Sequence, residues 1–460
     1  MSVLPPATIA IIGAGPVGVE AALYARFLGY DVRVYDRGRI ADSVRRWGQV
    51  RLFSPFGMNV SSLGLAAIQA QDPEWQPPDD DALLTGREFA AAYLLPLAAT
   101  DLLRDHVHEN TEVVAVGRSS SLKHELVGQE SRGDDDFRIL VRDATDQERV
   151  DTADVVIDAS GTYGHHNWLG QGGIAAVGEP AARDAIAYEL PDVLGDDRRH
   201  YAGRRVLVVG GGYSAATTIV SLAQLARDEP GTSVVWVTRP PADGATRTQP
   251  IVRIPHDRLT ARDTLAAAAN ALAADADSTV EYRPNRWVRA ITRDETTGAL
   301  TVELSAGDEP IAHDAAQQNN AQQDDPERRT VEEVAVEQIT VDQIIANVGY
   351  RPDHRLSDEL QLHRCYASDG PMKLAAALLA ASISTSSDTP VDCLDQSSPG
   401  PAALLTPEPD FYVLGAKSFG RNSQFLLSVG LEQVRDLFTI IGDREDLDLY
   451  RTTALRGGVT

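Results

Sequence analysis

The sequence predicts an α/β fold built on parallel sheets, because a short apolar strand leads into a glycine-rich turn and an alanine-rich helix at two places. The first turn, GAGPVG at residues 13–18, fits the pattern G-x-G-x-x-G, and the second, GGGYSA at residues 210–215, fits G-x-G-x-x-A. Such a turn places the free N–H groups of the helix start where they can bind a diphosphate. Two of these units predict two Rossmann-like dinucleotide-binding domains.

The first unit contains each part of a dinucleotide site in the expected order. An apolar strand at Ile9–Ile12 leads to the turn, and a helix rich in alanine and leucine follows at Val19–Leu28. The first glycine of the turn permits the tight bend, the second lets the backbone approach the diphosphate, and the third lets helix and strand pack closely. We expect the cofactor to be bound by Gly13, Gly15, Pro16 and Gly18.

Asp36 ends the second strand of this unit, Val32–Tyr35, where a carboxylate can accept hydrogen bonds from ribose hydroxyls. Because strand, helix, second strand and acid follow one another in register, the pattern favours a dinucleotide site. The alternative is a glycine-rich turn in an ordinary βαβ unit that binds no cofactor.

The composition excludes several classes of protein. The formal net charge is −25 and no basic block offsets it, so we expect no nucleic-acid partner. Cys365 and Cys393 are the only cysteines, too few for a secreted fold held by disulfides. The longest apolar stretch, Leu374–Ile383, is too short to span a bilayer. We therefore expect a cytoplasmic protein with no membrane partner and no metal site, and we leave a homodimer open.

Two further segments of the first unit are expected near its cofactor. Trp47 lies in the loop after the second strand, where an aromatic side chain can wall a planar ring; packing on the core is the alternative for it. A buried strand at residues 155–157 then ends in a turn of small residues, DASG. Its last two residues, Ser160 and Gly161, let a ligand approach the end of that strand.

The second unit predicts a nicotinamide coenzyme. Its strand Val234–Val237 ends at Thr238 and Arg239, where NADH-specific folds place an acid. An acid would repel a 2′-phosphate, whereas Arg239 can pair with one, so NADPH is favoured over NADH. The alternative for Arg239 is a surface charge at the start of a proline loop. The remaining expected coenzyme-binding residues are those of the turn and the helix start: Gly210, Gly212, Tyr213, Ser214 and Ala215.

The last third of the chain returns to strand and turn patterns after a polar insertion at residues 307–333. Gly349 follows a strand pattern at 339–347, and Gly415 follows an apolar strand at 411–414. Both glycines are expected at the cofactors. An amphipathic helix is expected at Ser423–Ile441.

The order of these motifs resembles the two-dinucleotide-binding-domain flavoproteins, the superfamily of glutathione-reductase-like and flavin-containing monooxygenase enzymes. The motifs that carry the resemblance are GAGPVG with Asp36, DASG, GGGYSA with Arg239, NVGYRPD at 347–353, and FYVLGAKSFG before the last helix. The resemblance implies a discontinuous FAD-binding domain formed by residues 1–165 and 341–460. It also implies an NAD(P)H-binding domain, residues 166–340, inserted into it.

Three departures from the superfamily patterns bear on the reaction. No C-x-x-C or C-x4-C pair is present, so a dithiol relay lacks its electron carrier. The Gly-Asp that commonly precedes the last helix is Gly415-Ala416 here. The monooxygenase fingerprint F-x-G-x-x-x-H is not matched by the corresponding segment, residues 178–188.

Together these patterns predict an FAD-dependent oxidoreductase that NADPH reduces, with monooxygenation of a small-molecule substrate by O2 as the leading hypothesis. Candidates for catalytic contacts with the reacting end of the flavin are Ser54, Asn59 and Lys417, by position only. One alternative is an NADPH-dependent reductase of a small disulfide, quinone or protein partner. Another is a flavin-binding sensor without turnover.

Overall fold

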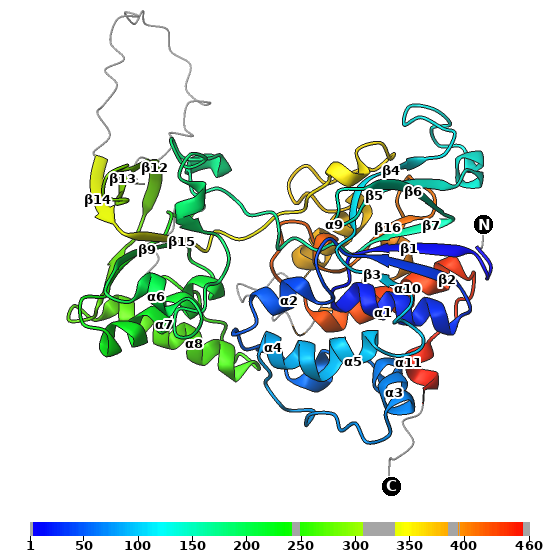
Figure 1. The fold of residues 1–460 in the computed structure, drawn as a ribbon, viewed down its shortest axis with the longest axis horizontal. Helices are drawn as coiled ribbons and strands as arrows, with labels where there is room; N and C mark the ends of the chain where they lie inside the picture. The colour runs from blue at the N-terminus through cyan, green and yellow to red at the C-terminus, as the bar shows by residue number, and fades with distance from the viewer. Residues whose placement is uncertain (1–2, 242–248, 307–335, 385–393, 395, 454–460) are drawn as a thin grey trace, which may run out of the picture. The chain divides into compact units, whose positions relative to one another are not determined.

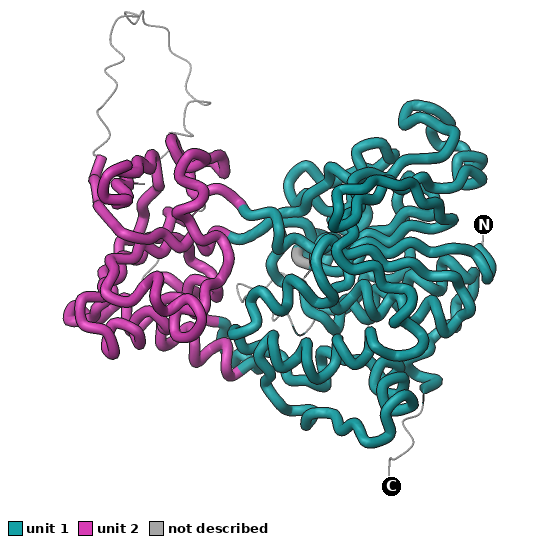
Figure 2. The backbone as a smooth tube through the Cα atoms, in the orientation of Figure 1, with its two compact units in different colours: residues 1–166, 254–259, 349–460 teal, residues 167–253, 260–348 magenta. Residues whose placement is uncertain are grey.

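The computed structural model describes residues 3–241, 249–306, 336–384, 394 and 396–453. The chain forms two compact units (Figure 2). Unit 1 comprises residues 1–166, 254–259 and 349–460, and unit 2 comprises residues 167–253 and 260–348. The sequence placed the domain boundaries after residues 165 and 340. Which cofactor each domain holds stays a prediction.

The centre of unit 1 is a sheet of five parallel strands in the order β16–β7–β1–β2–β3 (Figure 1). These strands are β1 (Thr8–Ile12), β2 (Asp31–Tyr35), β3 (Val107–His108), β7 (Val155–Asp158) and β16 (Phe411–Val413). An antiparallel meander accompanies the sheet, formed by β4 (Glu112–Arg118), β5 (Phe137–Arg142) and β6 (Glu148–Ala153). The α-helices of unit 1 are α1 (Pro16–Phe27), α2 (Asp42–Arg46), α3 (Ser62–Gln71), α4 (Gly86–Phe89), α5 (Leu95–Ala98), α9 (Met372–Ser384), α10 (Leu427–Ile441) and α11 (Leu449–Thr452).

Unit 2 repeats this plan with a second parallel sheet, in the order β11–β10–β9–β15–β8. Its strands are β8 (Ile186–Ala187), β9 (Arg205–Val209), β10 (Ser233–Val237), β11 (Val280–Arg283) and β15 (Gln343–Ala346). Its meander is formed by β12 (Arg286–Arg293), β13 (Leu300–Ala306) and β14 (Val336–Val341), and its helices are α6 (Arg198–Tyr201), α7 (Tyr213–Asp228) and α8 (Thr260–Ala274). The predicted α/β fold with two Rossmann-like domains is confirmed.

Each sheet is buried on both faces, which explains why its strands read as continuous apolar runs. In β9, Val206 and Val208 pack with α7 and α8, whereas Leu207 and Val209 pack with the meander of unit 2. Unit 1 has the same three layers, because one face of its sheet packs on α1 and α10 and the other on β4 and β5. The carboxyl ends of the strands remain at the edge of these layers, where the glycine-rich turns lie.

One helix agrees with the sequence expectation and another begins later than expected. The sequence predicts a helix over residues 86–103 that Pro96 bends or splits, and the structure divides it into α4, a π-helical turn at Ala90–Leu94, and α5. The wider turn precedes the proline, which has no N–H to donate. The last helix begins at Leu427, four residues after the expected Ser423, and Leu426 at its N-cap makes no side-chain cap. The predicted insertion at 307–333 lies outside the described residues.

A carboxylic acid is buried in the core of unit 1. Glu20 on α1 is 1 % exposed and accepts hydrogen bonds from the hydroxyls of Ser61 and Tyr93. Tyr450 on α11 lies against the same site, and burial raises the pKa of its phenol, as it does for Tyr93. Burial, only partly offset by these hydroxyl groups, raises the pKa of Glu20 to about 7. No cation pairs with the carboxylate among the described residues, so its ionisation costs stability.

We predict that Glu20→Gln removes a pH-dependent loss of stability. Between the unfolded value of 4.5 and the folded value of about 7, the folded state binds more protons at Glu20 than the unfolded state does. Wild-type stability should therefore fall as pH rises through this window, by up to about 3 kcal/mol, because each pKa unit is worth about 1.4 kcal/mol. Unfolding free energies measured from pH 4.5 to 8 should show this loss in the wild type and not in Glu20→Gln. The exposed Glu74→Gln is the control and should retain it; equal slopes in all three proteins would refute the prediction.

Candidate functional site

The glycine-rich turn of unit 1 has two glycines that the protein itself requires and one that faces open space. Gly13 has φ +103°, and a Cβ there would lie 2.7 Å from the carbonyl oxygen of Ala159. A Cβ at Gly18 would overlap the carbonyl oxygen of Gly13. A Cβ at Gly15 would meet no atom within 4 Å. Gly15 also caps α1, and Pro16 begins it, so unpaired helix-start N–H groups border this space. The turn fits a dinucleotide diphosphate.

A pocket of about 430 Å³ adjoins this turn at the carboxyl ends of β1, β2 and β7. Its lining joins segments that are far apart in the sequence, including Gly13, Asp36, Arg46, Val114, Ser160, Gly161 and Arg355. A pocket of this size is in the range of small-molecule and cofactor sites. Four of the residues predicted to bind the cofactor (Gly13, Asp36, Ser160 and Gly161) therefore line one pocket.

Asp36 closes the turn as well as facing the pocket. Its two carboxylate oxygens accept hydrogen bonds from the backbone N–H groups of Ala14, at 2.7 Å, and Gly38, at 2.8 Å. Burial raises the pKa of Asp36, and these two hydrogen bonds oppose the rise. Each carboxylate oxygen has a further lone pair, so the group can hold the turn and still accept from a ribose hydroxyl.

Val114 is a pocket residue that the sequence motifs did not indicate. In the β4–β5 ladder Val113 pairs with Val141 and Ala115 pairs with Leu140, so Val114 is an extra residue without a partner in the ladder. Such a bulge frees a backbone N–H and C=O, and Val114 lies on the pocket. An apolar residue within a strand carries no sequence signal for this role.

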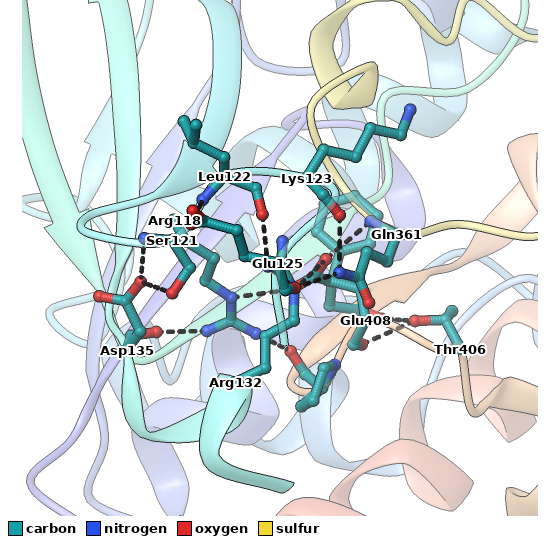
Figure 3. A network of polar contacts seen from close by, with 12 residues as sticks. Arg118, Ser121, Leu122, Lys123, Glu125, Arg132, Asp135, Gln361, Thr406 and Glu408 are labelled. Carbon is teal, nitrogen blue, oxygen red and sulfur yellow. Dashed lines mark hydrogen bonds and ion pairs between the residues drawn. The ribbon is translucent and has the colours of Figure 1, made fainter. Parts of the chain in front are cut away.

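A buried network of charges holds β4 in place (Figure 3). The Glu408 carboxylate accepts hydrogen bonds from Arg118 Nε at 2.8 Å, Arg132 Nε at 2.9 Å and the backbone N–H of Gln361 at 2.7 Å. All three charged side chains are at most 1 % exposed. The Arg118 guanidinium also stacks on Phe137, 3.8 Å from the ring centroid. The network thus joins the meander to the segment that follows Arg355 in the chain, and both contribute to the pocket wall.

The candidate catalytic residue Lys417 forms a buried ion pair at the end of β7. Its Nζ lies 2.5 Å from Asp158 Oδ2 and 3.0 Å from Ser160 Oγ. Both charged side chains are 1 % exposed. Gly415, at φ +69°, begins the turn that carries Lys417, and its N–H donates to the buried Gln433 at 2.8 Å. The pair fixes the DASG turn to the turn before α10; a contact between Lys417 and the flavin stays a prediction.

The other candidates near the flavin are held by short-range contacts. Ser54 Oγ donates to Asn59 Oδ1 at 2.8 Å, and Asn59 Nδ2 donates to the carbonyl oxygens of Ser54 and Pro55. The buried Asn59 amide thereby closes the turn around Phe56–Met58. Trp47 packs partly buried against the core, over Gly86. Their roles at a cofactor stay predictions.

The turn of unit 2 reproduces the geometry of the first. Gly210 has φ +147°, and a Cβ there would overlap the carbonyl oxygen of Asn347 at the end of the neighbouring strand. A Cβ at Gly212 would meet no atom within 4 Å, as at Gly15. Gly212 caps α7, whose first residues are the predicted Tyr213, Ser214 and Ala215. This turn therefore also fits a diphosphate.

The end of β10 presents one buried and one exposed polar residue. Thr238 is 8 % exposed, and its hydroxyl lies 2.9 Å from that of Tyr282. Arg239 is exposed. Gly349, at φ +83°, lies just beyond β15, as the first residue of the chain's return to unit 1. Among the described residues, no group of three His, Cys, Asp or Glu side chains could hold a metal ion.

Comparison with protein families identifies the relatives of this fold. Residues 10–297 match the family model described as pyridine nucleotide-disulphide oxidoreductase. The chain belongs to this family. Its members are oxidoreductases that use FAD and NADPH, which confirms the two expected cofactors and the predicted flavoprotein superfamily. No curated protein sequence matches the chain.

Solved structures with the same fold include both reductases and a hydroxylase. The bacillithiol disulfide reductase Bdr (YpdA) from Bacillus cereus is 16% identical, with a TM-score of 0.61 over 95% of this chain and 99% of that one. The Kutzneria sp. 744 ornithine N-hydroxylase KtzI is 14% identical, with a TM-score of 0.57 over 96% and 100%. Thioredoxin reductase from T. acidophilum is 16% identical, with a TM-score of 0.53 over 94% and 97%. At these identities the similarity shows the fold alone.

We predict that Gly15→Val abolishes flavin binding without unfolding the protein. Gly15 has an extended backbone, φ −78° and ψ −178°, which valine can adopt, and its Cβ would enter the open space beside α1. Flavin content per protein should fall at least about tenfold while the unfolding temperature of the flavin-free protein is kept.

Gly18→Val is the contrasting variant, because its Cβ would overlap the Gly13 carbonyl oxygen within the protein. It should lower the unfolding temperature of the flavin-free protein as well. Full flavin content in Gly15→Val would show that the cofactor lies elsewhere.

Proposed function

We propose that the protein is an NADPH-dependent flavin monooxygenase that acts on a small molecule. FAD bound in unit 1 supplies the redox chemistry, and NADPH bound in unit 2 supplies two electrons. One oxygen atom of O2 enters the substrate and the other leaves as water, so NADPH and one proton balance the reaction. The chain's own residues would bind the two dinucleotides at Gly15 and Gly212 and exclude water from the reacting groups.

The observation that carries this proposal is the lack of a dithiol. The relay pairs typical of disulfide reductases, C-x-x-C and C-x4-C, are both missing from this sequence, whose cysteines are Cys365 and Cys393. Electrons delivered by NADPH then lack such a thiol pair as acceptor, and O2 is an acceptor that needs no protein group to carry electrons. KtzI gives a precedent for hydroxylation on this fold.

No helix among the described residues is long and apolar enough to cross a membrane.

One feature favours a second candidate, a reductase that uses a single thiol. Cys365 is partly exposed, and the hydroxyl and backbone of Ser368, with the N–H of Ala367, lower the pKa of its thiol. A lowered pKa increases the thiolate that attacks a disulfide. The Cys365 turn also packs against the turn after Lys417, because the carbonyl oxygen of Ser368 accepts from the backbone N–H of Arg421 at 2.7 Å. Cys393 lies outside the described residues.

The electron acceptor separates the two candidates. In air, NADPH oxidation by the purified protein should consume O2 in equal amounts, and Cys365→Ser should leave this rate within about twofold. Without O2, bacillithiol disulfide or glutathione disulfide should not support NADPH oxidation. Disulfide-dependent oxidation that disappears in Cys365→Ser would establish the reductase instead. Flavin that NADPH fails to reduce at all would favour a sensor.

We predict that Arg239 selects NADPH over NADH. An arginine contact with the 2′-phosphate is worth about 1.5–3 kcal/mol, so Arg239→Ala should raise the KM for NADPH by about ten- to a hundredfold. The KM for NADH, which has no 2′-phosphate, should change far less. Flavin reduction measured with both coenzymes tests this.

Arg247→Ala is the control for this prediction, because Arg247 is the next arginine along the chain after Arg239 and lies outside the described residues. An unchanged coenzyme preference in Arg239→Ala, with a loss of preference in Arg247→Ala, would transfer the role to Arg247.

A further inference from the structure

Asn347 has a buried side-chain oxygen without a donor. The residue follows β15 directly and is 9 % exposed. Its Oδ1 is fully buried and accepts no hydrogen bond from any described residue. Leaving a buried amide oxygen unpaired is costly, and most such groups in folded proteins have a partner. A buried acceptor without a partner therefore marks a place where a ligand can supply the missing donor.

The Asn347 side chain lies against the glycine-rich turn of unit 2. Strand β15 runs parallel to β9, with Ala346 opposite Val209, so Asn347 and Gly210 leave the sheet side by side. A Cβ at Gly210 would lie 3.3 Å from the Cβ of Asn347. The unpaired amide therefore lies beside the turn in which Gly212 caps α7 and borders open space.

The order of the strands assigns Asn347 to one half of a dinucleotide. Strand β9 lies between β10 and β15. The chain passes from β9 through α7 to β10 on one side, whereas β15, on the other side, comes much later in the sequence. The strand order therefore reverses at β9, and a crevice opens between β9 and β15. A dinucleotide lies across such a crevice with its diphosphate at the glycine-rich turn. The proposed 2′-phosphate contact, Arg239, follows β10 and places the adenosine half on that side. The nicotinamide half then lies on the β15 side, where Asn347 is.

Unit 1 shows that the turn itself does not need an amide at this position. There the residue at the end of the neighbouring strand, against the first glycine, is Ala159. Its backbone makes the same close approach to Gly13 that Asn347 makes to Gly210. Since a methyl group suffices for the packing in unit 1, the amide in unit 2 calls for a different explanation.

We propose that Asn347 Oδ1 accepts a hydrogen bond from a hydroxyl of the nicotinamide ribose. This inference rests on the proposed NADPH site in unit 2 and adds a residue that recognises the reacting half of the coenzyme. The ribose is the first group beyond the diphosphate on the β15 side, and each of its hydroxyls can donate. The contact orients the nicotinamide and does not take part in electron transfer.

Three ligands of increasing length test the assignment by calorimetry. They are 2′,5′-ADP, which ends at the adenosine half, 2′-phospho-ADP-ribose, which adds the second ribose, and NADP+, which adds the nicotinamide. The variants are Asn347→Ala, which reproduces the unit 1 residue, and Asn347→Leu, which fills a similar volume without an acceptor. Arg239→Ala is the contrasting variant, because it should weaken all three ligands.

Both Asn347 variants should bind NADP+ and 2′-phospho-ADP-ribose about five- to fiftyfold more weakly, because a hydroxyl of the ligand loses its acceptor. Their affinity for 2′,5′-ADP should stay within about twofold of wild type. Weakening confined to NADP+ would assign Oδ1 to the carboxamide and overturn the ribose contact. Equal weakening of all three ligands, or of none, would also overturn the inference. Wild-type protein that binds none of the three would overturn the NADPH site of unit 2 itself.

The ligand-free protein gives an independent readout. Asn347→Leu removes a buried acceptor that has no partner, so its unfolding temperature without ligand should equal or exceed that of the wild type. The increase in unfolding temperature on adding NADP+ should be smaller than in the wild type. A large loss of stability in the ligand-free variant would show that Asn347 serves the fold and would overturn the assignment.

Discussion

Both units depend on one close approach, between the first glycine of the turn and the backbone that ends the neighbouring parallel strand. In unit 1 the pair is Gly13 and Ala159, and in unit 2 it is Gly210 and Asn347. A side chain on either glycine would push the turn away from the sheet, and the helix that follows would lose its position. Because this contact fixes where each helix begins, it also fixes the open space in front of Gly15 and Gly212. The same backbone constraint thus shapes both glycine-rich turns that fit a diphosphate.

In unit 1, buried ion pairs hold together segments that are far apart in the sequence. Lys417 joins the DASG turn to the turn before α10, and Glu408 joins two arginines of the meander region. Buried charges are expensive to desolvate, so each of these contacts holds only when its partner is in place. They confer little net stability compared with apolar packing of the same volume. Their effect is to specify which segments meet, and two of those segments, the DASG turn and the meander, line the pocket beside Asp36.

Much of the fold could be predicted because its signals are local. The strand, turn and helix at Thr8–Phe27 follow from a run of apolar residues and three glycines, and the repeat at residue 205 follows in the same way. The site was predictable only where a motif marks it. Val114 belongs to the pocket through a bulge that depends on a partner strand, and the connection between β4 and β5, which is rich in polar residues, contains the buried Arg132. Lys417 meets Asp158 across 259 residues of sequence. Local patterns do not encode such pairings, nor do they indicate the uncapped start of α10.

The network around Glu408 has a consequence for the order in which the chain is made. Arg118 and Glu408 are separated by 290 residues, so synthesis of all of unit 2 comes between them. Until the carboxylate leaves the ribosome, both arginines must remain hydrated, and β4 cannot settle against the sheet with them buried. The wall that carries Val114 therefore matures after translation is nearly finished, although the glycine-rich turn opposite it is among the first segments to emerge. A cofactor arriving early would find only half of its pocket.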